Sequence, residues 1–80
     1  FKLLKSINNS QFSLKKIKNL YFFKSGRWDI ETTSDTLIRL PKYGLEKSLN
    51  LSLEMMESDQ FNKISILDLR QKNQVIIDGK

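Results

Sequence analysis

The chain begins with a hydrophobic pattern typical of a helix. Phe1, Leu4 and Ile7 recur every third residue, which places them on one face of an α-helix. The polar sequence Asn-Asn-Ser follows Ile7 and ends the pattern. The spacing therefore predicts a helix that ends near residue 9.

From Leu14 the pattern becomes that of a β-strand. Residues 14–24 are rich in aromatic side chains, which favour strands. Because side chains alternate between the two faces of a strand, we expect Ile17, Tyr21 and Phe23 to point toward the core. The sequence Ser-Gly follows at positions 25 and 26 and predicts a turn.

Residues 27–32 and 36–40 together predict a β-hairpin. Residues 27–32 alternate hydrophobic with polar positions, and a Thr-Ser-Asp turn follows. In residues 36–40, Ile38 and Leu40 face one side and Leu37 and Arg39 the other. Pro41 ends the second strand, because proline has no backbone N–H to donate to a neighbouring strand. The alternation predicts one apolar face, formed by Trp28, Ile30, Ile38 and Leu40.

The opposite face of this hairpin is predicted to be ionic. Arg27, Asp29 and Glu31 share it with Arg39 of the second strand. We expect Asp29 or Glu31 to pair with Arg39 across the two strands, an interaction worth about 0.2–1 kcal/mol.

The rest of the chain predicts one helix and two strands. A helix over residues 45–58 is indicated by hydrophobic residues at helical spacing, namely Leu45, Leu49, Leu53 and Met56. Residues 63–70 and 74–78 then predict two strands joined by a turn in which Asn73 can adopt a left-handed conformation. The order helix-βββ-helix-ββ predicts an α+β fold, an antiparallel or mixed sheet of about five strands with the helices on one face.

Length and composition limit the possible functions. A chain of 80 residues forms a single domain, residues 1–80. It contains no Cys and no His, and its three Gly do not form a phosphate-binding loop. Thiolate or imidazole zinc sites and nucleophilic triads are therefore excluded. We expect no cofactor, no metal and no catalytic site, and we predict that the protein is not an enzyme.

The charge distribution raises an alternative function. Residues 1–24 hold six of the 14 basic residues and no acidic residue, so they carry +6, whereas the remainder carries −1. Lys18, Lys24 and Arg27 flank the aromatic sequence Tyr-Phe-Phe, a mixture found in proteins that bind single-stranded nucleic acids. The alternative is a small basic nucleic-acid-binding domain, although we expect the aromatic side chains to be needed in the core.

The chain contains the segments GRWDI (26–30), LIRLP (37–41) and ISILDLR (64–70) in this order. Together they resemble two parts of the bacterial cell-division protein family FtsQ, called DivIB in Gram-positive bacteria. Gly26 to Ile30 (GRWDI), followed by Leu37 to Pro41 (LIRLP), resembles the family's RWDL…G…I.LP segment. After the second helix, Ile64 to Arg70 (ISILDLR) is similar to the family's I..IDLR strand. The motifs occur in the same order and with similar spacing, and the resemblance covers about residues 1–78.

The resemblance implies a scaffold without enzymatic activity. Members of this family are single-pass proteins of the bacterial inner membrane, with a POTRA domain and a distal β domain on the periplasmic side. The chain resembles a fragment containing the β domain, which implies that the membrane anchor and the POTRA domain lie upstream. The implied function is a divisome scaffold that docks FtsB-like and FtsL-like division proteins during septum formation. No nucleic acid is expected as a partner, and the membrane is reached only through the upstream anchor.

The resemblance also implies where the partner binds. In this family the FtsB-like partner contributes a short strand that pairs with the last strand of the β domain, which is strand addition at a sheet edge. Carried over by position, the implied partner-binding residues are Arg70, Gln71, Asn73, Val75, Ile76 and Ile77, with Arg27 as a further basic contact. Several relatives have an aromatic or apolar residue where this chain has Gln71. We expect Asp68 to be structural, whereas Arg70 can pair either within the domain or with the partner.

Overall fold

The computed structural model describes residues 2–58, 64–71 and 74–79 and contains two α-helices and five strands. The elements are α1 (Lys2–Asn9), a 3-10 turn (Leu14–Lys16), β1 (Ile17–Phe22), β2 (Trp28–Thr32), β3 (Leu37–Arg39), α2 (Leu45–Glu57), β4 (Ile64–Asp68) and β5 (Ile76–Gly79). The predicted α+β fold and the predicted order of its elements are confirmed. Phe1, Lys63 and Asn73, which the sequence assigned to a helix, a strand and a turn, lie outside the described residues.

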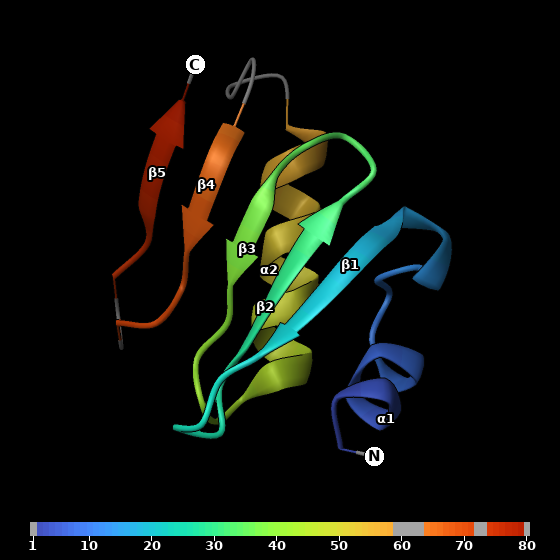
Figure 1. Cartoon of the computed structure of the whole chain (residues 1–80). Coiled ribbons are helices and arrows are strands. Elements are labelled where there is room, and N and C mark those ends of the chain that lie inside the picture. The colour runs from blue at the N-terminus through green and yellow to red at the C-terminus, as the bar shows by residue number, and fades with distance from the viewer. Residues whose placement is uncertain (1, 59–63, 72–73, 80) are drawn as a thin grey trace.

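The five strands form one sheet in the order in which they occur along the chain, β1-β2-β3-β4-β5. Neighbouring strands are antiparallel except β3 and β4, which are parallel. A parallel pair needs a long crossover connection, and here α2 provides it. As Figure 1 shows, α2 lies behind the sheet, and the face toward the viewer carries no helix. We call this uncovered side the open face.

The core lies between the sheet and the two helices. Its buried side chains come from both helices, from β2, β3 and β4 and from connecting segments, and are Leu3, Ile7, Phe12, Ile30, Ile38, Leu40, Leu49, Ile64, Leu67 and Leu69. The predicted inward positions of Ile30, Ile38 and Leu40 are confirmed, and Trp28 packs against the same cluster while staying half-buried. In α2 the predicted hydrophobic stripe also faces this core, and Leu49 is its fully buried member.

The predicted inward orientation of Tyr21 and Phe23 is wrong. Their side chains are 44% and 39% exposed, whereas Leu20 packs against the core. The cause is a β-bulge, since Ile17 lies opposite Thr32 but Asn19 already lies opposite Glu31. One extra residue in β1 shifts the alternation of all later side chains to the other face.

A buried leucine of α2 tests how much the core stabilises the fold. Leu49→Ala should lower the free energy of unfolding by about 2–5 kcal/mol, because it leaves a cavity where a fully buried side chain was. Urea unfolding followed by circular dichroism measures the loss. Leu51→Ala on the same helix is the matched control, because Leu51 is 37% exposed, and its effect should be about 1 kcal/mol or less. Equal losses in the two variants would contradict the assignment of the core face.

Candidate partner-docking edge and open sheet face

The last strand, β5, is an edge of the sheet. It pairs with β4 alone, with Ile76 opposite Asp68 and Ile77 opposite Leu67. Because side chains alternate, Ile77 packs against the core while Ile76, which is 45% exposed, lies on the open face. An edge strand presents unpaired backbone N–H and C=O groups on its outer side. Residues 76–79 contain neither Pro nor Lys, so β5 lacks two common features that prevent edge pairing.

The opposite edge, β1, is less suited to accept a strand. It contains the bulge between Ile17 and Asn19, and the residue within that bulge is Lys18. Bulges and lysines both discourage pairing with another chain. The two edges therefore differ in their capacity for strand addition, and β5 is the more open one.

Most of the residues that the resemblance implied as partner contacts gather around the start of β5, whereas Arg27 precedes β2, and β3 and β4 lie between β2 and β5. Arg70 and Gln71 follow β4 and are exposed, and Val75, which is 38% exposed, precedes β5. A groove opens beside them, lined among others by Tyr43, Leu51, Leu69 and Val75. The implied contact Asn73 lies outside the described residues.

Asp68 and Arg70 form an ion pair within the domain. One carboxylate oxygen of Asp68 accepts hydrogen bonds from the backbone N–H of Arg70 at 3.0 Å and from its Nε at 2.9 Å. The other accepts from the Nη2 of Arg70 at 2.7 Å. The side-chain hydrogen bonds from Arg70 lower the pKa of Asp68 and raise that of Arg70. The predicted structural role of Asp68 in this turn is confirmed, and Arg70 pairs internally while its side chain stays 39% exposed.

Arg27 is also held by groups of its own domain. Its Nη1 donates to the carboxylate of Asp29 at 2.8 Å and to the carbonyl oxygen of Leu40 at 3.2 Å. Its guanidinium lies over the ring of Phe23, 4.8 Å from the centroid, a cation–π contact. Phe23 therefore covers Arg27 from the solvent side of the open face.

Glu31 has partners other than the predicted one. Its carboxylate accepts hydrogen bonds from the Nδ2 of Asn19 and from the hydroxyl of Tyr21, both at 2.8 Å. These bonds lower the pKa of Glu31, and the bond to Glu31 raises the pKa of Tyr21. In the sheet register Glu31 lies opposite Leu37, so it is not the cross-strand neighbour of Arg39.

Arg39 is the arginine that sequence reasoning did not select as a contact. It lies opposite Asp29 on one side and opposite Asp68 on the other. Its predicted ion pair with Asp29 or Glu31 is wrong, because Asp29 pairs with Arg27 and Glu31 with Asn19 and Tyr21. Among the described residues no carboxylate forms an ion pair with Arg39, and its buried Nε has no hydrogen-bond partner.

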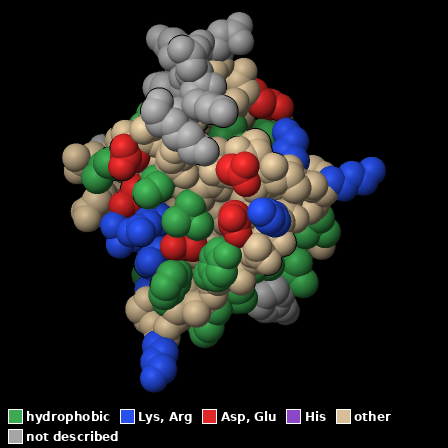
Figure 2. Space-filling view, turned by 45° about the horizontal axis from the view of Figure 1, so that its top comes forward, with side chains coloured by type: hydrophobic (Ala, Val, Ile, Leu, Met, Phe, Trp, Pro, Cys, Tyr) green, Lys and Arg blue, Asp and Glu red, His purple; other side chains and the backbone are tan. Residues whose placement is uncertain are grey.

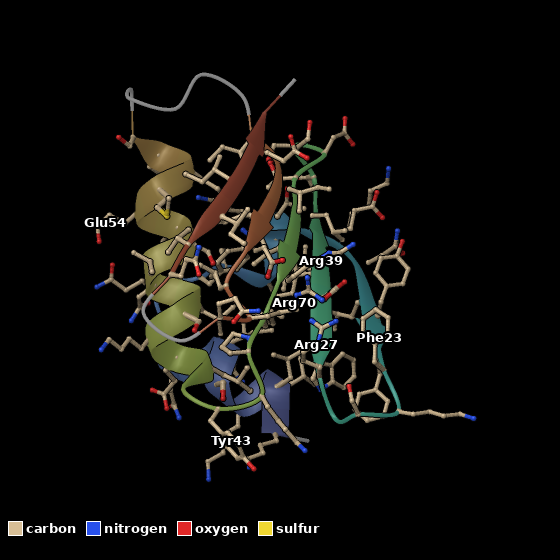
Figure 3. The ribbon with its side chains drawn as sticks, turned by 90° about the vertical axis from the view of Figure 1, so that its left-hand side faces the viewer. Phe23, Arg27, Arg39, Tyr43, Glu54 and Arg70 are labelled. Carbon is tan, nitrogen blue, oxygen red and sulfur yellow. The ribbon has the colours of Figure 1, made fainter. Side chains whose placement is uncertain are left out.

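Together these side chains form a row across the open face, which we call the charged row. It consists of Arg27, Asp29, Arg39, Asp68 and Arg70. Figure 3 shows its three arginines, together with Phe23, on the side of the sheet away from α2. In Figure 2 acidic, basic and hydrophobic side chains are interleaved on the visible surface, with no large area of a single sign. The sheet register places Asp29, Arg39 and Asp68 side by side on this face. Alternation within its own strand was the available signal for Arg39.

The described part of the chain offers no group of three metal-ligating side chains. None of its described helices is long and apolar enough to cross a membrane. The structural candidates for function are therefore the edge strand β5 with its groove, and the charged row on the open face.

Comparison with known proteins adds no family assignment. No protein-family model, no curated protein and no solved structure matches this chain.

The Asp68–Arg70 pair predicts an acid-dependent stability. The folded pKa of Asp68 lies below its ordinary value, which is about 3.9 in an unfolded chain. The stabilisation is therefore complete above the ordinary pKa and is lost as the pH falls through the lower folded pKa. We expect Asp68→Asn to weaken the decline of unfolding free energy with acid, measured by urea unfolding from about pH 7 to about pH 3.

Arg70→Gln supplies the matching variant. It removes the guanidinium donors to Asp68 but keeps the backbone N–H donor. It should therefore weaken the acid dependence, though less than Asp68→Asn does, and the double variant should add little to Asp68→Asn. An acid dependence identical in the wild type and in Asp68→Asn would show that this pair does not contribute to stability.

Proposed function

We propose that this domain is a non-enzymatic docking module that accepts a strand of a partner protein at β5. The observation that carries the proposal is the position of β5 at the edge of the sheet, with hydrophobic side chains on both of its faces. In strand addition the backbone hydrogen bonds provide affinity, and the alternating side chains provide specificity.

The side chains around β5 fit this mode of binding. Ile76 would contact the partner strand on the open face, and Val75 would contact it beside the groove that Tyr43, Leu51 and Leu69 also line. Arg70 and Gln71 are exposed at the same end of β5. Both carboxylate oxygens of Asp68 already accept hydrogen bonds from the guanidinium of Arg70. A partner carboxylate that binds Arg70 would therefore share this guanidinium with Asp68.

The identity that we propose for the module is the β domain of an FtsQ/DivIB-like division protein. The GRWDI, LIRLP and ISILDLR segments support it, since in the fold they form β2, β3 and β4 of one sheet, followed by the edge strand. The partners would then be FtsB-like and FtsL-like division proteins. The full-length protein would act on the periplasmic face of the bacterial inner membrane as a single-pass divisome scaffold during septum formation.

Proline substitutions in β5 test strand addition. Successive residues of an edge strand direct their N–H groups alternately toward the neighbouring strand and away from it. Of Ile76→Pro and Ile77→Pro, one should therefore remove an outward donor and the other a donor to β4. We expect the variant that loses the outward donor to keep its pairing with β4 and to fold. It should bind a peptide of the FtsB-like protein from the same organism at least about tenfold more weakly than the wild type does. Fluorescence anisotropy measures binding, and thermal melting measures folding.

Valine at the same position (Ile76→Val or Ile77→Val) is the matched control, because it keeps the backbone N–H and a β-branched hydrophobic side chain. It should bind within a few fold of the wild type. If the folded proline variant bound the peptide as tightly as this control, strand addition at β5 would be wrong.

The nucleic-acid-binding alternative gains support from one observation. Tyr21 and Phe23 are exposed on the open face, where bases could stack, instead of lying in the core. Against it, the same face carries Asp29, Glu31 and Asp68, which repel phosphates, and Arg27 already covers one side of Phe23. Strand addition is therefore the function that the geometry supports better.

A salt titration separates these two functions. A nucleic-acid-binding domain would bind a labelled single-stranded oligonucleotide tightly at low salt and lose affinity steeply as salt is added. We expect no such binding in an anisotropy titration at low ionic strength. Salt-dependent binding that Tyr21→Ala weakens, while the fold is preserved, would favour the alternative.

A further inference from the structure

Arg39 occupies an unusual place in the charged row. The row contains three guanidinium groups and two carboxylates, and each carboxylate is already bonded to another arginine. Asp29 pairs with Arg27 at 2.8 Å and Asp68 pairs with Arg70 at 2.7 Å. Arg39, at the centre of the row, therefore forms no ion pair at contact distance with a described residue, although it lies opposite both carboxylates and its charge helps to lower the pKa of Asp68.

The burial of Arg39 makes this lack of partners significant. Its side chain is half-buried, and its Nε has no acceptor within the described chain although the atom is shielded from solvent. Buried donors in folded proteins nearly always have an acceptor. A guanidinium presents five N–H donors in a planar arrangement that matches the two oxygens of a carboxylate.

We infer that the open face binds an acidic peptide segment of a protein partner, whose carboxylate pairs with Arg39. The surroundings favour a carboxylate over a phosphate group. Arg39 lies between Asp29 and Asp68 in the register, and two flanking negative charges repel a doubly charged group more than a singly charged one. Nucleic acids also require several basic contacts along one path, whereas this face interleaves both signs.

The residues next to Arg39 define the rest of the segment. Leu37 and Ile66 lie opposite each other on the open face, two residues before Arg39 and Asp68 in β3 and β4. Both side chains are half-buried. Ile76 on β5 extends this surface with an exposed side chain. The partner segment should therefore carry apolar side chains beside its Asp or Glu.

This contact is distinct from strand addition at β5. Arg39 is on β3, and β4 and β5 lie between it and any added strand. At a spacing of about 4.8 Å per strand, an added strand would run about 14 Å from β3, farther than a Glu side chain reaches. The acidic segment must cross the open face itself, so the two contacts can be tested separately.

The test uses a capped Ser-Leu-Glu-Leu-Ser peptide and its Gln counterpart. Each is titrated into the isotopically labelled domain while nuclear magnetic resonance follows the backbone amides and the arginine Nε–H groups. The Glu peptide should shift the Arg39 Nε–H signal and the amides of β2, β3 and β4, and it should bind at least about tenfold more tightly than the Gln peptide. Acetate should compete better than inorganic phosphate.

Arg39→Gln should weaken this binding at least about tenfold, while Lys47→Gln, an equal charge change at an exposed position of α2, should leave it unchanged. Arg39→Lys, which keeps the charge but lacks the planar guanidinium that can pair with both carboxylate oxygens, should bind with intermediate affinity. The folded proline variant of β5 should bind the Glu peptide normally, so failure of strand addition and failure of this proposal are distinguishable.

Three results would overturn the proposal. The first is the absence of saturable binding of the Glu peptide up to millimolar concentration. The second is an unchanged affinity in a folded Arg39→Gln variant. The third is stronger competition by phosphate than by acetate, which would assign the site to a phosphate group instead.

Discussion

The parallel pairing of β3 with β4 is the interaction on which the rest of this structure depends. It places Ile38 beside Leu67 in the core and Arg39 beside Asp68 on the open face. The pairing is possible because α2 returns the chain to the end of the sheet where β3 began. The same crossover covers one face of the sheet, and it leaves β4 to pair with β5 on its other side. Core, open face and accessible edge therefore all follow from one connection.

Alternate residues of each strand lie on opposite faces of the sheet, and the two faces differ in how they are stabilised. Positions facing α1 and α2 are mainly hydrophobic and supply the burial that a domain of 80 residues needs. Positions on the open face hold carboxylates that are only 4% and 8% exposed, Asp29 and Asp68. Buried carboxylates are tolerated when hydrogen bonds satisfy them, and Arg27 and Arg70 provide those bonds. The open face is thus ordered by ion pairs instead of by a second layer of helices.

This arrangement changes how the arginines are interpreted. Arg27 and Arg70, the basic residues that the family resemblance implied as partner contacts, both have acidic partners inside the domain. Arg39, which the resemblance did not select, has no ion-pair partner in the described part of the chain. A partner that approaches the edge at β5 and one that crosses the open face would use different groups. The two contacts that we propose would therefore use separate surfaces of the domain.

Much of the fold was predictable because it depends on local properties of the chain. Helical spacing in residues 45–58 and alternation in residues 27–32 and 36–40 reflect how neighbouring side chains project from a helix or strand. The orientation of Tyr21 and Phe23 was not predictable in this way. A bulge depends on the pairing of β1 with β2, and no local pattern in residues 14–24 reveals it.

The sequence by itself determined the helices, the strands, the hydrophobic face of the hairpin and the four charged residues on its other side, Arg27, Asp29, Glu31 and Arg39. Tertiary structure alone decided the position of the bulge, the acidic partner of each arginine, and which strands form the edges. The physical reason is that projection from the backbone is local, whereas pairing depends on which distant segments become neighbours. Arg39 shows the difference most clearly. Its face was set by its own strand, but its lack of a carboxylate partner was set by Asp29 and Asp68 pairing elsewhere.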